Sequence, residues 1–398
     1  MPQIKNVCLL TLQRIGETYG GIESFVLSLS SWLSKKGINA IILARRISFF
    51  KPVVVFIGNN GVKEKKMSRA LTIKLPLFLY AIGMLFSSFF AILMMYRLLR
   101  HKNFDLIHAQ DPSFSGFAGV IFSKITGIPL LIHSHGPPNY ILEKSFGDSL
   151  IWRVIESTLI RISVNNALLT FVTDRKTESV IASIVRKPAK IASCPTAINF
   201  QEYQNISPKT SSSYRNKNKN EIILGFIGRL TLQKNPEIIL KALAELNDVP
   251  VKMYVVGDGP LLNQLKDKVC KLGIQNKVHF FGSIPERRKL ELLQEIDIFL
   301  MPSLEEGCPI ALLEAMAAGK AIIASNIYSI RNIVNHLKEA VLVNPYNIEE
   351  LKQAILTLYN NLDLRIKLSK EARRKAKQYD VNKVYDQILK VYESVMQR

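Results

Sequence analysis

The 398-residue sequence has few cysteines, and it lacks the features of an exported protein. Its four cysteines include no C-x-x-C pair and no zinc-ligand spacing with a histidine. So few thiols in a chain of this length exclude a disulfide scaffold and favour a reducing compartment. Residues 1–12 lack the apolar run and the small-residue cleavage site of a signal peptide. We therefore expect a first strand there and a cytoplasmic location.

Motifs for cofactors and metal ions are also absent from the sequence. Residues 16–21 lack the G-x-G-x-x-G spacing of dinucleotide-binding loops, and no Walker sequence or D-x-D pair suited to Mg²⁺ occurs. His133 and His135 alternate along one expected strand, but no third ligand lies near them in the sequence. We expect no cofactor and no metal ion, and a metal pair at these two histidines is the alternative.

Acidic side chains are strongly outnumbered. The chain contains 53 basic and 32 acidic residues, a formal net charge of +21. Residues 1–200 contain 24 basic and 10 acidic side chains, a net of +14, and residues 201–398 contain 29 and 22, a net of +7. This excess predicts a polyanionic partner, which can be nucleic acid, an anionic membrane surface or a phosphorylated substrate. Solvated lysines without a partner are the alternative. The basic residues are scattered and no helix-turn-helix, zinc or RNA-recognition pattern occurs, so we expect no nucleic acid.

One long stretch without charge occupies residues 75–96, LPLFLYAIGMLFSSFFAILMMY. Its 22 residues are long enough for a transmembrane helix, although a span here would pull one crossover away from the sheet that it must cover. A wholly buried core helix is the second interpretation. The third is a membrane-facing helix, because five basic residues lie directly upstream between positions 63 and 74. All three stay open, and the third predicts an anionic membrane surface as a partner.

Short apolar segments alternate with amphipathic helical segments along the chain. Strands are expected at residues 4–11, 40–44, 105–108, 129–133, 168–173, 222–227, 251–256, 278–281, 296–301 and 321–324, and helices at 24–36, 236–246, 261–272, 288–295, 309–318, 349–359 and 365–396. This order predicts an α/β fold with two doubly wound Rossmann-like domains.

The expected domain boundaries follow from a polar segment in the middle of the chain, NISPKTSSSYRNKNKN. The domains are an N-terminal domain over residues 1–200, a linker over 201–220, a C-terminal domain over 221–378, and a C-terminal helix over 379–398 that packs back towards the first domain. Parallel sheets bind ligands at the carboxyl ends of their strands. Two such edges facing each other would form an interdomain cleft for two substrates.

The stretch from Glu306 to Lys320, EGCPIALLEAMAAGK, follows an expected strand directly. Pro309 suits the first helical position and Gly319 the position after the last turn. The helix therefore begins at the carboxyl end of the strand, where its dipole and free N–H groups favour an anion. Glu314 is the one charged residue of an otherwise apolar helix, and a buried carboxylate needs partners. We expect ribose hydroxyls there, and the alternative is a cap on a neighbouring loop.

The stretch from Gly228 to Pro236, GRLTLQKNP, also follows an expected strand. Arg229 and Lys234 flank a loop that leads into a helix. These two cations can neutralise a pyrophosphate without a metal ion. Solvated surface cations are the alternative at both positions.

The order of these motifs resembles the large family four of glycosyltransferases, the glycosyltransferases group 1, which have the GT-B fold. The motifs that carry the resemblance are GRL-x3-KN, VGDGP at 256–260, FG at 281–282, and two glutamates separated by seven residues. Residues 20–23, GGIE, resemble the family's glycine loop before the first helix, and residues 132–136, IHSHG, resemble its HG segment. The resemblance covers nearly the whole chain.

The resemblance implies a retaining, metal-independent hexosyltransferase that takes a sugar from a nucleotide-diphosphate sugar. The implied catalytic residues are Glu306, Arg229, Lys234 and His135. The implied donor-binding residues are Gly20, Gly21, Gly228, Gly257, Phe281, Gly282, Gly307, Cys308, Pro309 and Glu314. In such enzymes the leaving phosphate oxygen serves as the base, so no protein nucleophile is implied.

Among these residues the implied roles differ. Arg229 and Lys234 hold the diphosphate, and Glu314 binds the ribose. Glu306, with the backbone of Gly307 and Cys308, holds the donor sugar. His135 lies near the transferred sugar, Gly21 offers a backbone N–H near the diphosphate, and the segment 281–284 holds the base.

The resemblance further implies a glycan or lipid-linked acceptor, a place in polysaccharide or lipopolysaccharide assembly, and a peripheral position on the inner face of the cytoplasmic membrane. The sequence departs from the family at residues 196–199, TAIN, where Asn-Gly-Ile/Val-Asp is frequent. Residues 45–100 and 137–165, the acceptor region, show no recognisable pattern. A sugar-nucleotide epimerase of the same fold is the alternative enzyme, and a basic nucleic-acid-binding protein is the alternative without catalysis.

Overall fold

The computed structural model describes residues 4–14, 21–45, 52–58, 61–62, 104–136, 150–185, 191–204, 221–246, 249–307 and 309–397. The chain forms two compact units. Unit 1 comprises Met1–Ala197 and Val381–Arg398, and unit 2 comprises Ile198–Asp380. The apolar stretch 75–96 and most of the expected linker lie outside the described residues. Among the described residues, no helix combines the length and apolarity needed to span a membrane.

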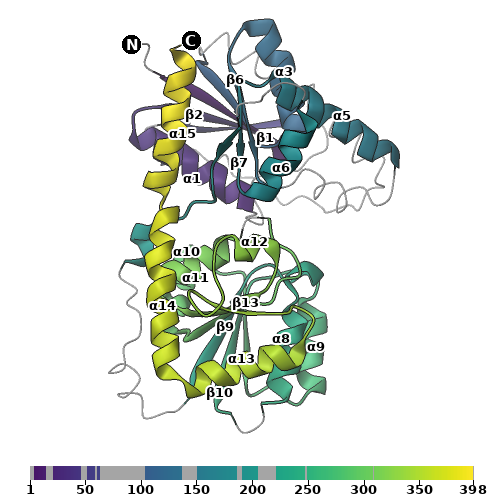
Figure 1. The fold of residues 1–398 in the computed structure, drawn as a ribbon, viewed down its shortest axis with the longest axis vertical. Helices are drawn as coiled ribbons and strands as arrows, with labels where there is room; N and C mark the ends of the chain where they lie inside the picture. Colours follow the sequence, from purple (N-terminus) through teal and green to yellow (C-terminus); the bar gives the residue numbers. More distant parts are fainter. Residues whose placement is uncertain are drawn as a thin grey trace. The chain divides into compact units, whose positions relative to one another are not determined.

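Unit 1 contains a sheet with the order β4-β3-β2-β1-β5-β6-β7-β8 (Figure 1). Its strands are β1 (Asn6–Arg14), β2 (Asn39–Arg45), β3 (Pro52–Gly58), β4 (Gly61–Val62), β5 (Leu106–Ala109), β6 (Leu130–Ser134), β7 (Leu169–Val172) and β8 (Ile191–Ser193). β3 pairs antiparallel with β2 and β4 antiparallel with β3, while the other pairs are parallel. The antiparallel edge was not expected, because residues 45–100 gave no pattern.

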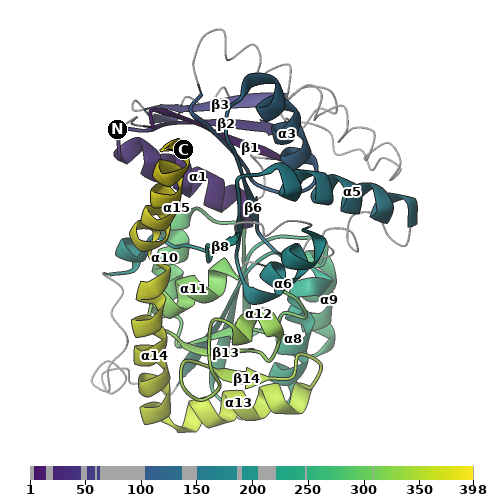
Figure 2. The same ribbon diagram turned by 45° about the horizontal axis from the view of Figure 1, so that its top comes forward.

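Helices cover both faces of this sheet (Figure 2). They are α1 (Gly21–Lys35), α3 (Phe114–Thr126), α5 (Leu150–Asn166), α6 (Arg175–Ile184) and α15 (Val381–Met396). Successive residues of β1 point to opposite faces, so that Leu9 joins the core under α1 and α15, and Leu10 joins the core under α3 and α5. The C-terminal helix α15 is therefore part of unit 1, and Trp32 Nε1 donates a hydrogen bond of 2.9 Å to Asn382 Oδ1.

Unit 2 contains a parallel sheet with the order β11-β10-β9-β12-β13-β14. Its strands are β9 (Ile222–Ile227), β10 (Val251–Val256), β11 (Val278–Gly282), β12 (Ile298–Met301), β13 (Ala321–Ser325) and β14 (Val341–Val343). Its helices are η1 (Phe200–Tyr203), η2 (Leu232–Lys234), α8 (Pro236–Ala244), α9 (Leu262–Lys271), α10 (Glu286–Glu295), α11 (Ile310–Ala317), α12 (Tyr328–Arg331), α13 (Ile348–Asn360), α14 (Leu362–Ala376) and η3 (Lys377–Tyr379).

The two faces of the unit 2 sheet bury separate cores. Helices α8, α9 and α13 pack on one face, and α10, α11 and α14 pack on the other (Figure 1). All four residues of β12 are buried, as expected for a parallel strand covered on both faces. The α/β class with two doubly wound units is confirmed.

A topological switch point lies between β9 and β12. From β9 the chain adds β10 and then β11 on one side, and it later returns to place β12 on the other side of β9. The loops that follow β9 and β12 therefore diverge at the carboxyl edge of the sheet. In open α/β sheets this is the position where ligands bind.

Candidate active site

The loop after β9 brings both predicted diphosphate cations to the carboxyl edge of unit 2. Arg229 is exposed and forms no ion pair within the described part of the chain. Lys234 ends the short helix η2, and Asn235 follows with φ of 49°. The side-chain Nδ2 of Asn235 donates to Pro345 O at 2.8 Å, which holds this left-handed turn. Pro236 then begins α8 at a position where a missing N–H costs nothing.

The loop after β12 places a glutamate directly on Lys234. The Lys234 Nζ atom lies 2.6 Å from Oε1 and 2.7 Å from Oε2 of Glu306. Ser303 Oγ donates to Glu306 Oε1 at 2.7 Å, and the Glu306 side chain is buried. Two residues 72 positions apart in the sequence thus form one charged pair at the switch point. Gly307 and Pro309 follow, and α11 begins at Ile310.

Glycines allow the neighbouring loops to touch at this edge. Gly257 has φ of 131°, and a Cβ atom on it would lie 2.0 Å from Gly228 O. Gly257 N donates to Gly282 O at 2.8 Å, and Gly228 N donates to Val256 O at 3.0 Å. Backbone contacts therefore bring together Gly228, Gly257 and Gly282, which lie at the ends of three adjacent strands. A side chain at position 257 would collide with the backbone of Gly228, so this position requires glycine.

Phe281 lies at an irregularity at the end of β11. The register between β10 and β11 shifts there, because Val255 pairs with Phe280 and Val256 pairs with Gly282. Phe281 is the extra residue, and its ring contacts Tyr254 edge-on at 5.0 Å between centroids. A bulge of this kind re-aims a side chain at a sheet end, as a binding role would require.

Glu314 is buried and paired, as its place in an apolar helix requires. Lys289 Nζ on α10 lies 2.7 Å from Glu314 Oε1 and 2.8 Å from Glu286 Oε1. The Tyr203 hydroxyl donates a further hydrogen bond to Glu314. Burial raises the pKa of the Glu314 carboxyl above its ordinary value, while Lys289 opposes the rise. No motif or periodicity in the sequence distinguishes Lys289 or Tyr203.

In unit 1, His135 follows β6 and belongs to a stack of buried rings. Its ring lies parallel to that of His133 at 4.0 Å between centroids, and Phe25 meets it edge-on. Burial lowers the pKa of His135 to about 3, so the ring is neutral near pH 7. Gln110 donates through Nε2 to His108 O, so its Oε1 accepts from His135 Nε2 at 3.2 Å. The neutral ring therefore carries its proton on Nε2.

Two buried carboxyls of unit 1 were also missed in the sequence. Asp111 follows β5 and accepts hydrogen bonds from the backbone and hydroxyl groups of Ser113 and Ser115. Glu156 on α5 is buried, and its two oxygens have no hydrogen-bond partner among the described residues. Burial and then the nearby Asp111 raise the pKa of Glu156 to about 8.

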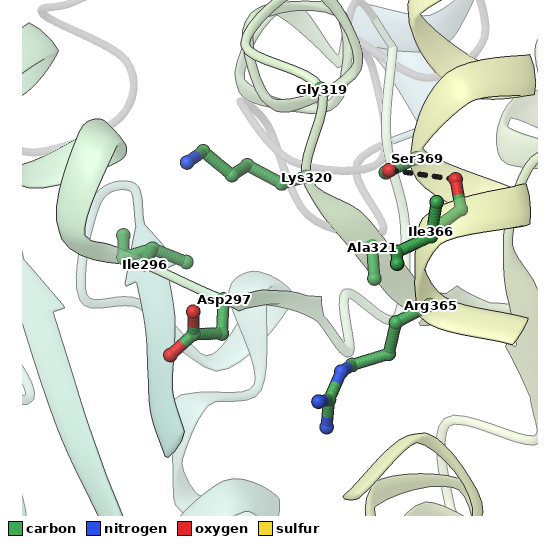
Figure 3. A pocket seen from close by; sticks show the side chains of 8 residues that line it. All are labelled: Ile296, Asp297, Gly319, Lys320, Ala321, Arg365, Ile366 and Ser369. Atoms are coloured by element: carbon green, nitrogen blue, oxygen red, sulfur yellow. Dashed lines mark hydrogen bonds between the residues drawn. The ribbon is translucent and has the colours of Figure 1, made fainter. Parts of the chain in front are cut away.

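Other features of unit 2 lie away from this edge. A cavity of about 10 Å³, the room of one water molecule, is lined by Asp297, Lys320 and Arg365 (Figure 3). Asp297 precedes β12 and Lys320 precedes β13, so the cavity lies at the amino edge of the sheet. Within the described ranges, no three His, Cys, Asp or Glu side chains are grouped to hold a metal ion.

Some predicted site residues cannot be placed. Gly20 and Cys308 lie outside the described residues. Gly21 is described and begins α1. The structure brings Arg229, Lys234, Glu306 and the glycines to one edge of unit 2, with Glu314 on the helix that follows Glu306.

This arrangement defines the class of protein: an α/β chain of two doubly wound units, one with a charged switch point. Two family models match the sequence, "Glycosyltransferase Family 4" over residues 19–202 and "Glycosyl transferases group 1" over residues 209–375. The chain therefore belongs to the group 1 glycosyltransferases with the GT-B fold, and it is an enzyme.

Curated relatives share about a quarter of their residues with this chain. The UDP-Gal:alpha-D-GlcNAc-diphosphoundecaprenol alpha-1,3-galactosyltransferase of Escherichia coli is 26% identical over 76% of this chain and 78% of its own length. The N,N'-diacetylbacillosaminyl-diphospho-undecaprenol alpha-1,3-N-acetylgalactosaminyltransferase of Campylobacter jejuni is 27% identical over 75% of this chain and 80% of its own. A sucrose-phosphate synthase from Thermosynechococcus elongatus has the same fold, with a TM-score of 0.79, 17% identity and 99% coverage of both chains.

Proposed function

We propose that this glycosyltransferase is a retaining, metal-independent enzyme that moves a hexose from a uridine-diphosphate sugar to a lipid-linked acceptor. The observation that carries the proposal is the charged switch point of unit 2, where Lys234 and the exposed Arg229 lie on one loop beside Glu306. Two cations at such an edge suit a diphosphate, which carries the charge that develops as the sugar leaves.

The structure suggests how Lys234 is prepared for this task. Its ammonium group is held by both oxygens of Glu306, which fix its position at the carboxyl edge of the sheet. Preorganised charge stabilises a leaving group without reorganisation at the moment of reaction. Arg229 supplies a second cation, and the free N–H groups at the start of α11 supply a dipole of the same sign.

The donor and acceptor classes rest on the relatives. One is named for UDP-Gal, and both are named for diphospho-undecaprenol acceptors and alpha-1,3 products. An alpha-linked nucleotide sugar gives an alpha product only by retention of configuration. Polysaccharide or lipopolysaccharide assembly at the cytoplasmic face of a membrane stays part of the proposal through the family resemblance. His135 near the transferred sugar and Gly21 near the diphosphate remain part of the proposal through the family resemblance.

The first test is a screen of nucleotide sugars for protection against thermal unfolding, because a ligand that binds the folded chain raises its apparent stability. We expect UDP-sugars to protect the wild-type protein and to lose this effect in Arg229→Ala and Lys234→Ala. Wild-type protection and turnover in both variants would overturn the assignment of the diphosphate site.

The second test uses the product. The configuration at the anomeric carbon, read from the one-bond C–H coupling by NMR, is expected to match that of the donor. Activity is expected to persist in excess EDTA. An inverted product, or loss of activity that Mg²⁺ restores, would contradict the retaining or the metal-independent part separately. Epimer formation from the donor alone would favour the epimerase alternative.

A further inference from the structure

The Glu314 carboxylate is held from two directions by residues outside its own helix. Lys289 reaches it from α10, and Tyr203 reaches it from η1, the segment with which unit 2 begins. Tyr203 is buried, with 2% of its surface exposed, and Lys289 is half-buried, with 15% of its side chain exposed. Glu286, the first residue of α10, is the second carboxylate on Lys289. Within the described part of the chain, these three groups are the charged and titratable neighbours that act on Glu314.

The hydrogen-bonding capacity of the carboxylate leaves room for a ligand. An ionised carboxylate has about four lone-pair positions on its two oxygens. Lys289 takes one on Oε1 and the Tyr203 hydroxyl takes another, so two positions remain among the contacts of the described residues. A pair of vicinal hydroxyls, as on ribose, offers two donors.

We propose that Lys289 and Tyr203 are positioning residues for nucleotide recognition, which hold the Glu314 carboxylate so that its remaining lone pairs accept from the two ribose hydroxyls of the donor. This inference rests on the proposed function and adds to it the residues that set the preference for ribose. Neither residue touches the sugar in this proposal. Both act through Glu314.

Lys289 also links two parts of the nucleotide site. Its second partner, Glu286, directly follows the segment 281–285, and Phe281 and Gly282 in that segment are the residues expected at the base. One ammonium group therefore connects the start of α10, which follows the base segment, to the ribose carboxylate on α11. A displacement of Lys289 would disturb both contacts.

The charge balance around Glu314 gives the inference a distinctive pH signature. Burial already raises the pKa of Glu314, and Lys289 and the Tyr203 hydroxyl counter that rise, while Glu286 adds to it. Removal of the ammonium group takes away the main opposing interaction, so the pKa of Glu314 rises further. A higher pKa favours the protonated carboxyl, in which one oxygen carries a hydrogen and accepts less well, and a higher pH counters this by favouring the ionised form.

The experiment compares the affinity of the full-length protein for UDP and for 2′,3′-dideoxy-UDP, which lacks both ribose hydroxyls. The measured quantity is the ratio of the two dissociation constants at pH 7 and pH 9. The variants are Glu314→Ala, Lys289→Met, Lys289→Arg and Tyr203→Phe. Lys352→Met is the matched control, because Lys352 is also bonded to two glutamates, Glu245 and Glu349, with its side chain 19% exposed.

We expect wild-type protein and Lys352→Met to prefer UDP by at least about tenfold, the fold-change of a hydrogen bond to a charged group. Glu314→Ala abolishes the preference at both pH values. Lys289→Met lowers the preference, and lowers it more at pH 7 than at pH 9. Lys289→Arg retains the preference, and Tyr203→Phe lowers it.

The outcomes separate this inference from the proposed function. If Glu314→Ala keeps the wild-type ratio of dissociation constants, Glu314 does not bind the ribose hydroxyls, and the inference fails as well. A collapsed ratio in Glu314→Ala together with wild-type ratios in Lys289→Met and Tyr203→Phe would overturn the inference alone. Equal loss in Lys289→Met and Lys289→Arg would also overturn it, since rescue by a second cation is not expected of a merely structural role. Tyr203→Phe, which removes a single oxygen, keeps the test decisive if Lys289→Met does not fold.

Discussion

Two buried lysine–glutamate pairs lie near the carboxyl edge of the unit 2 sheet, and they differ in what else binds the carboxylate. Glu306 receives both contacts of Lys234 and the Ser303 hydroxyl, while Glu314 receives Lys289 on one oxygen and Tyr203. When one partner of such a pair is removed, the other is left as an uncompensated buried charge. A single substitution at one of these positions therefore changes both the free energy of unfolding and the catalytic rate.

The Lys234–Glu306 pair offers a way to separate the two effects. Lys234→Met is expected to lower the free energy of unfolding by about 3 kcal/mol, because Glu306 keeps its charge without a partner. Glu306→Gln in the same chain removes that charge, so thermal unfolding should return towards wild type. Turnover of the UDP-sugar should stay low in both variants, since the loss of one charge-stabilising group costs about 10²–10³-fold. Equal instability of the single and double variants would contradict the pairing.

Ionisation of the buried Glu156 carboxyl lowers the free energy of unfolding. Its pKa in the folded chain is about 8, above the ordinary value of 4.5. Below pH 4.5 the carboxyl is protonated in both the folded and the unfolded chain. Between pH 4.5 and 8 the unfolded chain releases the proton while the folded chain keeps it, so the free energy of unfolding falls as the pH rises.

We therefore expect Glu156→Gln to be more stable than wild type at pH 8.5, by about 2 kcal/mol or more, and nearly equal to it at pH 5. Thermal unfolding across this pH range measures the difference. Glu178→Gln, at an exposed position of α6, is the control and should show no such trend. A constant difference between Glu156→Gln and wild type at all pH values would show that the carboxyl stays ionised.

At the scale of elements, the sequence was most informative where hydrophobic periodicity and loop motifs coincide. Strands β9, β10 and β12 and the start of α11 were predicted within a few residues, because buried parallel strands are short apolar runs and Pro309 marks a helix start. The motif loops after these strands follow directly, so the predicted residues of unit 2 lie at one edge.

Side-chain contacts between elements that are distant in the sequence could not be predicted from hydrophobic periodicity or from loop motifs. Lys289 lies in a polar helix, ERRKLELLQE, where a further lysine gives no signal. Tyr203 reaches Glu314 from a short helix 111 positions earlier in the chain, and Tyr392 of α15 reaches His108 across 284 positions. Such pairs depend on which faces pack together, which sequence periodicity does not specify. The antiparallel strand β3 was missed because residues 45–100 showed no pattern.

The loop packing at the edge makes a prediction for Gly257. Gly257→Ala would place a Cβ atom 2.0 Å from Gly228 O, and both are backbone-fixed. Gly273 also has positive φ, at 68°, but a Cβ atom there meets nothing within 4 Å. We expect Gly273→Ala to cost about 1 kcal/mol, from backbone conformation alone. Gly257→Ala should cost more and should also raise the KM for the donor, because the loop with Arg229 moves. Equal effects of both variants on stability and KM would contradict this packing.

At the scale of the whole chain, each unit contains a sheet whose strand order reverses once. In unit 1 the reversal lies between β1 and β5, and in unit 2 between β9 and β12. The chain leaves unit 1 at Ala197 and returns to it at Val381, so that α15 completes the core beside α1. The excess of positive charge is twice as large in residues 1–200 as in residues 201–398, which bears on the membrane partner predicted from the sequence.

The last prediction follows from this charge and from the apolar stretch 75–96, which lies outside the described residues. A basic run at 63–74 beside an apolar helix would bind an anionic membrane, with about 1 kcal/mol from each basic side chain near the headgroups. We expect the purified protein to co-sediment with vesicles that contain anionic lipid, much less with neutral vesicles, and to be released in large part by high salt. Replacement of the five basic residues between positions 63 and 74 by glutamine should weaken binding in step with the charge removed. No binding to anionic vesicles would exclude a membrane-facing helix, and resistance to both salt and alkaline carbonate would favour a membrane span.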